Sequence, residues 1–178
     1  NEVCLLVNIV QAADYTVIRN VTVNGPAQIG VEWYPDTNAD LEKVSIQRSS
    51  DNIEYVNLTT YPIGLPIPVV DSYNDNSIAT NAISFYYRII TIDSCDNQDT
   101  SGYAKSIVLK GNDNANFTNT ISWTGFEIQD GIVQEYRIYR DDGAGLVLIN
   151  TVGAAIQTYT DHVAMFVNVI DEFCYQIE

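Results

Sequence analysis

The chain of 178 residues has few basic side chains, one histidine and no long hydrophobic run. Its 8 lysines and arginines stand singly among 23 acidic residues, which gives a formal net charge of −15. Binding phosphates requires a clustered cationic face, so we expect neither nucleic acid nor anionic lipid as a partner. No run of 18 apolar residues occurs, so we expect no membrane insertion. The start lacks the basic region of a signal peptide, so a mature or excised fragment is expected.

Metal and catalytic motifs are also missing. The three cysteines are widely spaced and form no CxxC pair, which excludes a zinc site. GxSxG, HExxH and glycine-rich phosphate motifs do not occur. A His-dependent catalytic arrangement would have to use His162, which follows Asp161 in a predicted turn, where exposed polar residues are common. We therefore expect no catalytic residue and no enzyme.

The sequence does contain an internal repeat. Val31-Glu32-Trp33 recurs 90 positions later as Ile121-Ser122-Trp123, and Val70-Asp71 recurs at the same offset as Thr160-Asp161. Phe85 to Ile89 recurs 88 positions later as Phe173 to Ile177. Matched segments in the same order and at nearly constant offset indicate two duplicated domains.

Each copy reads as short strands with period-two alternation, separated by turn residues, and this pattern predicts an all-β fold. The expected strands of the first copy are 20–23, 28–33, 43–48, 55–59, 84–92 and 103–109, and those of the second copy are 120–123, 134–140, 146–152, 158–160 and 173–177. The alternation places four large aromatic residues in the two cores, namely Trp33, Tyr87, Trp123 and Tyr175. The prediction is two tandem fibronectin type III or immunoglobulin-like β-sandwiches.

The repeat also sets the expected domain boundaries. Residues 1–17 form an upstream segment or stray strand, 18–110 the first sandwich, 111–118 a linker and the start of the second domain, and 119–178 the second sandwich. The second copy stops one residue after Ile177, so we expect it to lack its last strand and to leave an unpaired edge. We accordingly expect further parts of a parent protein on both sides, with neighbouring domains as partners.

Several segments resemble a known family. Ile46-Gln47-Arg48, Tyr136-Arg137-Ile138-Tyr139-Arg140, Tyr159-Thr160-Asp161 and Ile92-Asp93-Ser94-Cys95-Asp96-Asn97 are similar to fibronectin type III-like repeats of secreted Bacteroidetes surface proteins. The closest type is associated with gliding motility or carries a C-terminal sorting domain. Asp96 departs from the family, which commonly has glycine there. The resemblance covers the chain from about Arg19 onward, and it implies a cell-surface or secreted location, a spacer or adhesion role, and no catalytic residue.

The alternative function is a carbohydrate- or protein-binding accessory module of a secreted enzyme or a motility adhesin. Tyr34, Tyr86 and Tyr103 are the candidate ligand-facing aromatics, because tyrosines that share an exposed face can stack on sugar rings. The other interpretation is that they are ordinary strand residues. A calcium site is the one cofactor to consider, with Asp71, Asp75 and Asp93 as its candidate ligands, against the interpretation that these carboxylates are solvated surface.

The odd number of cysteines leaves two interpretations open. A Cys4–Cys95 disulfide could clamp the apolar segment around Cys4 onto the first sandwich and would leave Cys174 unpaired. Alternatively, all three thiols are reduced. Because Cys174 alternates with Phe173 and Tyr175, we expect its side chain to point away from the core.

Overall fold

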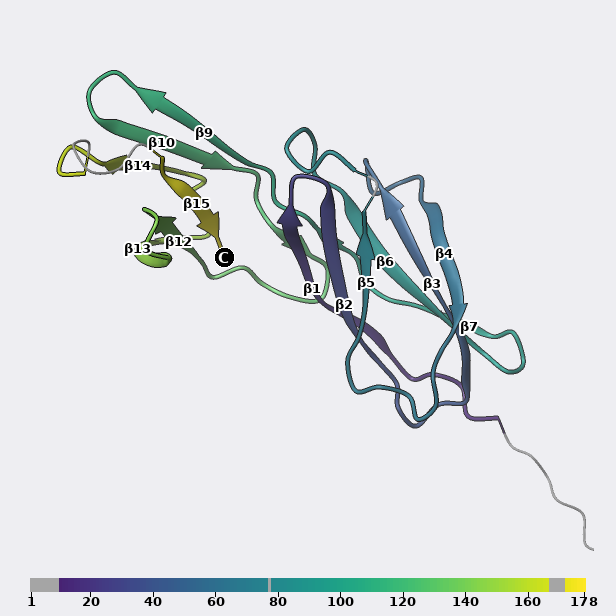
Figure 1. The fold of residues 1–178 in the computed structure, drawn as a ribbon. Coiled ribbons are helices and arrows are strands. Elements are labelled where there is room, and N and C mark those ends of the chain that lie inside the picture. Colours follow the sequence, from purple (N-terminus) through teal and green to yellow (C-terminus); the bar gives the residue numbers. More distant parts are fainter. Residues whose placement is uncertain (1–9, 77, 167–171) are drawn as a thin grey trace, which may run out of the picture.

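The computed structural model describes residues 10–76, 78–166 and 172–178. This part of the chain is all-β, with fifteen strands in antiparallel sheets (Figure 1). Among the described residues, no helix is long and apolar enough to cross a membrane. The strands form two units that lie end to end, the first comprising β1–β8 and the second β9–β15.

The first unit has two sheets. One sheet has the order β1-β2-β5, and the other has the order β11-β8-β6-β3-β4 with β7 also paired to β6. The strands span Thr16–Gly25 (β1), Gln28–Pro35 (β2), Leu41–Ser49 (β3), Val56–Pro62 (β4), Asp71–Asp75 (β5), Tyr86–Asp93 (β6), Gln98–Thr100 (β7) and Ala104–Lys105 (β8). Strand β11 belongs by sequence to the second unit, so this sheet contains strands from both units.

The second unit repeats this topology with fewer strands. Its sheets have the orders β9-β10-β14 and β13-β12-β15. The strands span Leu109–Asn114 (β9), Thr118–Trp123 (β10), Glu127–Ile128 (β11), Glu135–Asp141 (β12), Leu146–Gly153 (β13), Thr158–His162 (β14) and Cys174–Ile177 (β15). By chain order and pairing, β9, β10 and β14 correspond to β1, β2 and β5, while β12, β13 and β15 correspond to β3, β4 and β6.

Each unit has its own hydrophobic core between its two sheets, as in a β-sandwich. In the first core, Val31 and Trp33 of β2 face Ile46 of β3 and Tyr87 and Ile89 of β6, and all five are fully buried. The second core contains buried Ile121, Trp123, Tyr136 and Ile138. Alternation along the strands produces both cores, because every second side chain faces the opposite sheet.

The four predicted core aromatics differ in burial. Trp33 and Tyr87 are fully buried and Trp123 is buried, whereas Tyr175 is only partly buried against the second core. Neither Trp33 Nε1 nor Trp123 Nε1 has a hydrogen-bond acceptor among the described residues. Burial of the indole rings therefore has to outweigh the cost of two unpaired N–H groups, which is about 1–3 kcal/mol each.

Three expected boundaries need correction. Strand β1 begins at Thr16, and Gln11 exchanges hydrogen bonds with Asp40, so residues 11–17 belong to the first unit and are not an upstream stray strand. The last strand of that unit, expected over 103–109, pairs with β6 only at Ala104–Lys105. The expected linker at 111–118 is instead part of a hairpin in which β9 pairs with β10.

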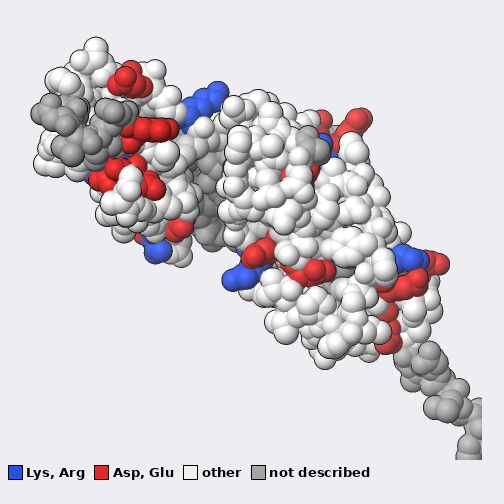
Figure 2. All heavy atoms as spheres, viewed as in Figure 1, with Lys and Arg blue, Asp and Glu red and all other residues white. Residues whose placement is uncertain are grey.

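Acidic residues outnumber basic ones in this chain, and the basic ones are not clustered in the sequence. Figure 2 shows acidic side chains over both units on the face in view, with basic side chains singly among them. Several of these cations contact acidic neighbours, including Arg19 with Glu32, Lys43 with Glu42 and Arg137 with Glu135. These exposed pairs contribute little to stability.

Candidate functional site

A buried polar cluster links the two sheets of the first unit. Asp75 lies on β5, and its carboxylate accepts hydrogen bonds from Arg48 Nη1 on β3 at 2.6 Å and from Tyr87 Oη on β6 at 3.0 Å. The Arg48 guanidinium also lies over the ring of Phe85, 4.9 Å from its centroid. Because Asp75 is almost completely buried, these hydrogen bonds replace contacts that water cannot make with its carboxylate. Burial, together with the neighbouring carboxylate, raises the pKa of Tyr87 well above its ordinary value.

The second unit contains the same cluster. Asp161 on β14 pairs with Arg140 on β12 at 2.9 Å and accepts a hydrogen bond from Tyr175 Oη on β15 at 2.9 Å. Arg140 lies over the ring of Phe173, the counterpart of Phe85. Burial is the main cause that raises the pKa of Tyr175, to about 12, and the hydrogen bond to Asp161 adds to it. A cross-sheet staple of arginine, aspartate and tyrosine is thus a repeated feature of both units.

This cluster corrects one segment of the repeat. The sequence offset matched Asp71 with Asp161, but in the sheets Asp75 pairs with Ile29 and Asp161 pairs with Asn119. Ile29 and Asn119 are equivalent by the same 90-residue offset that relates the two tryptophans. Asp75 is therefore the counterpart of Asp161. The first unit has four more residues between Trp33 and Asp75 than the second unit has between Trp123 and Asp161, and this shifts the offset.

The junction between the units is made of paired backbone. Strand β11 pairs antiparallel with β8, with Glu127 opposite Lys105 and Ile128 opposite Ala104. The Gln129 N–H donates to the Tyr103 carbonyl at 2.9 Å, and the Thr124 N–H donates to the Val108 carbonyl at 3.0 Å. The chain thus enters the second unit through β9 and β10 and then returns to add a strand to the sheet of the first (Figure 1).

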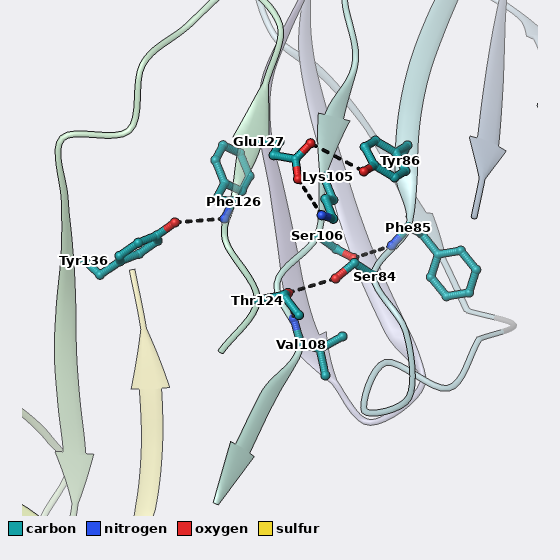
Figure 3. A network of polar contacts seen from close by, with 10 residues as sticks. All are labelled: Ser84, Phe85, Tyr86, Lys105, Ser106, Val108, Thr124, Phe126, Glu127 and Tyr136. Carbon is teal, nitrogen blue, oxygen red and sulfur yellow. Dashed lines mark hydrogen bonds and ion pairs between the residues drawn. The ribbon is translucent and has the colours of Figure 1, made fainter. Parts of the chain in front are cut away.

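Side chains reinforce this junction (Figure 3). Glu127 forms an ion pair with Lys105 and lies 3.4 Å from Tyr86 Oη, which donates to it. The hydroxyls of Ser84 and Thr124 lie 2.9 Å apart, one from each side of the junction. Tyr136 Oη on β12 accepts the Phe126 N–H at 2.9 Å.

Phe126 connects the two hydrophobic cores. Its side chain packs against the core of the first unit, as that of Ile128 does, and also against the core of the second unit, as that of Val133 does. A single apolar side chain shared by two cores opposes separation of the units, because separation would expose it to water. No sequence pattern indicated this arrangement, since a two-residue strand is too short to show alternation.

The three candidate ligand-facing tyrosines lie in two places. Tyr86 and Tyr103 meet edge to face, with ring centroids 5.6 Å apart, beside the junction. Tyr34 lies elsewhere, on β2. Lys105 Nζ lies over the Tyr86 ring at 5.3 Å, and the Arg19 guanidinium lies over the Tyr34 ring at 5.8 Å. These two rings therefore contact cations of the chain itself, an arrangement that favours a structural role for them.

The three candidate calcium ligands serve different local structures. Asp71 accepts the Ser72 N–H, Asp75 belongs to the staple, and Asp93 organises the loop after β6. In that loop the Asn97 side chain and the backbone amides of Cys95 and Asn97 donate to Asp93, and these bonds lower the pKa of its carboxyl group. Within the described ranges, no three Asp, Glu, His or Cys side chains are grouped to hold a metal ion.

Asp96 lies in the same loop with a strained backbone. Its φ is +62°, in the left-handed region that favours glycine. Asp96 accepts this conformation because short polar side chains tolerate it better than other non-glycine residues.

The remaining candidates are the cysteines and the histidine. Cys95 and Cys174 are both exposed, and Cys4 lies outside the described residues, so the Cys4–Cys95 disulfide stays a prediction. His162 is exposed, whereas its neighbour Asp161 is buried in the staple. Because adjacent residues of a strand face opposite sides, these two side chains cannot form a catalytic dyad.

Comparisons with known proteins do not identify a family for this chain. No protein family matches the chain, and no curated protein matches it. One solved structure to which it is similar is the beta-1,2-glucanase from Parabacteroides distasonis, with a TM-score of 0.43 and 19% sequence identity. The match covers 55% of this chain but only 13% of that protein. A likeness at this level does not establish a shared fold, and the activity in that name is not transferred to this chain.

Proposed function

We propose that the chain is a non-catalytic spacer or adhesion module, formed by two fibronectin type III-like sandwiches in a larger secreted or cell-surface protein. The observation that carries the proposal is the junction, in which β11 continues the sheet of the first unit and Phe126 packs into both cores. A spacer must hold its ends at a fixed separation and orientation. A junction of paired backbone does this better than a flexible linker, which would let the units move independently.

Two further observations support a structural role. The cross-sheet staples pair the buried carboxylates of Asp75 and Asp161 with arginines of the same unit, so these charged groups hold the two sheets together. The rings of Tyr34 and Tyr86 lie against the chain's own cations, which makes them poor platforms for a sugar ring. The secreted or cell-surface location follows from the sequence resemblance alone.

The test is whether the two units tumble as one body. Amide NMR relaxation of the intact chain should give the same rotational correlation time for residues of both units. Phe126→Ala should make the two correlation times diverge, because the variant loses the side chain shared by the cores. Ile132→Ala, at an 89% exposed position in the segment that follows β11, is the matched control and should leave joint tumbling intact. Independent tumbling of the units in the unmodified chain would contradict the spacer proposal.

A further inference from the structure

A cavity of about 740 Å³ lies at the junction of the two units, and we call it the junction pocket. Tyr103, Lys105 and Glu127, on or beside the sheet of the first unit, line it from one side. Tyr136 of β12 and Gln157, just before β14, line it from the second unit. Its volume lies in the range of small-molecule sites, about 300–1,000 Å³. Because the lining comes from both units, a binding role for the pocket rests on the rigid junction of the proposed function.

Tyr103 gives the junction pocket an aromatic surface. The rings of the other two candidate tyrosines, Tyr34 and Tyr86, each lie under a cation of the chain. No cation among the described residues lies over the Tyr103 ring, which meets Tyr86 edge to face. Tyr103 is half-buried, so neighbours hold its ring in place while part of the residue can still contact a ligand. A rigid ring of this kind is a platform for the apolar face of a sugar ring.

Two polar side chains in the junction pocket have unused hydrogen-bonding capacity. The buried Tyr136 hydroxyl accepts the Phe126 N–H at 2.9 Å (Figure 3), but its own proton has no acceptor among the described residues. The exposed Gln157 side chain makes no hydrogen bond within the described ranges. Both groups border Gly125, where an added Cβ would lie 2.7 Å from Gln157 Nε2 and 3.7 Å from Tyr136 Oη. Glycine there leaves both groups room to contact a ligand, and a buried hydroxyl without an acceptor favours a ligand that supplies an oxygen.

An ion pair adds charged groups of both signs to the lining. Lys105 Nζ lies 2.5 Å from a carboxylate oxygen of Glu127. The junction pocket therefore offers donors from Tyr136, Gln157 and Lys105, and it offers acceptors from Gln157 and Glu127. A sugar hydroxyl both donates and accepts, so a polyol matches this mixture. The net charge of −15 opposes the approach of an acidic sugar and favours a neutral one.

We propose that the junction pocket binds one neutral sugar residue of a glycan. The sugar ring lies against Tyr103, and its hydroxyls contact Gln157, Tyr136 and the pair of Lys105 and Glu127. Binding of this kind gives the adhesion role of the module a ligand. It also uses the junction as more than a spacer, because the site is complete only where the two units meet.

The test is an NMR titration of the intact, isotope-labelled chain with neutral disaccharides of glucose, mannose, galactose and N-acetylglucosamine. At least one of them should shift the Gln157 side-chain amide and the Gly125 backbone amide in a saturable manner. Gln157→Ala should weaken that binding roughly 3- to 10-fold, as expected for the loss of one hydrogen bond. This variant should fold normally, because within the described residues the Gln157 side chain makes no hydrogen bond.

The role of the ring is tested separately. Tyr103→Ala should weaken binding of the same disaccharide at least ~10-fold, whereas Tyr103→Phe keeps the ring and should retain binding. Tyr34→Ala is the matched control, because Tyr34 lies on β2, does not line the junction pocket and already contacts Arg19. It should bind as the unmodified chain does.

Three results would overturn the proposal. The first is the absence of a saturable shift with every disaccharide while the two units still tumble together, which would leave the spacer role intact and remove the sugar site. The second is unchanged affinity in both Tyr103→Ala and Gln157→Ala. The third is tighter saturable binding at the same amides by digalacturonate or by a tri-alanine peptide, because an acidic sugar or a peptide would then be the occupant.

Discussion

The carboxylate of Asp161 holds in the second unit the place that the carboxylate of Asp75 holds in the first. Each lies on the edge strand of one sheet and accepts hydrogen bonds from an arginine and a tyrosine of the facing sheet. The two staples differ in their surroundings, since Tyr87 is fully buried and Tyr175 is not. The same chemistry is therefore present at two levels of burial, and the two staples can be compared within one molecule.

Removing the staple carboxylate should destabilise the unit that contains it. Asp75→Ala leaves Arg48 and the Tyr87 hydroxyl without their acceptor, and the loss of one partner from a buried pair costs about 3–5 kcal/mol. Asp161→Ala should cost less, because Tyr175 is only partly buried and water can reach its hydroxyl more easily. Each unit has one tryptophan, so denaturation followed by fluorescence in Trp33→Phe and Trp123→Phe backgrounds reports on one unit at a time.

Asp113→Ala is the matched control for this comparison, because Asp113 is exposed on β9. It should leave both unfolding midpoints within experimental error of the unmodified chain. Equal and small losses for Asp75→Ala and Asp113→Ala would show that the staple does not stabilise the sandwich.

Alkaline pH should weaken both units through the staple tyrosines. The pKa of Tyr175 is raised from 10.0 to about 12 in the folded chain, so folding favours the neutral phenol. A raised folded pKa gives stability that is fully present below the unfolded pKa and is lost as pH rises through the folded one. The stability that Tyr175 contributes should be lost between about pH 10 and pH 12. The loss of the Tyr87 contribution should extend to higher pH, because burial raises the pKa of Tyr87 more.

Phenolate absorbance during a pH titration measures this directly. Tyr175→Phe should remove one late-ionising group and flatten the alkaline decline in stability of the second unit. Tyr15→Phe, at an exposed position in the first unit, is the control and should leave the alkaline decline in stability of the second unit unchanged. Ionisation of all tyrosines in one early step, while the chain stays folded, would contradict the prediction.

Calcium should not stabilise the chain. Asp75 is already paired with Arg48 and Tyr87, and Asp93 already accepts hydrogen bonds from its own loop, so binding a cation would require breaking these contacts. The midpoint of thermal unfolding should be the same with calcium as with chelator. A rise in the midpoint that Asp93→Asn abolishes would contradict the prediction and would restore the calcium site as a hypothesis.

Much of this architecture was predictable from the chain alone. Alternation of apolar residues predicted the strands that carry Trp33, Tyr87 and Trp123, because a strand with one buried face has a period of two whatever lies around it. The repeat likewise related the tryptophans of the two units. The repeat matched the wrong aspartate, Asp71, with Asp161. A constant offset in sequence does not take account of a difference in length in the crossover before β5.

Sequence by itself thus determined the all-β class, the duplicated pattern and the inward positions of the long strands, since these depend on local periodicity. The tertiary structure alone decided that Asp75 and Arg48 meet across two sheets, that Phe126 enters two cores, and that Glu127–Ile128 returns to pair with β8. Each of these depends on where distant segments lie in space, and contacts of that kind leave no period in the sequence.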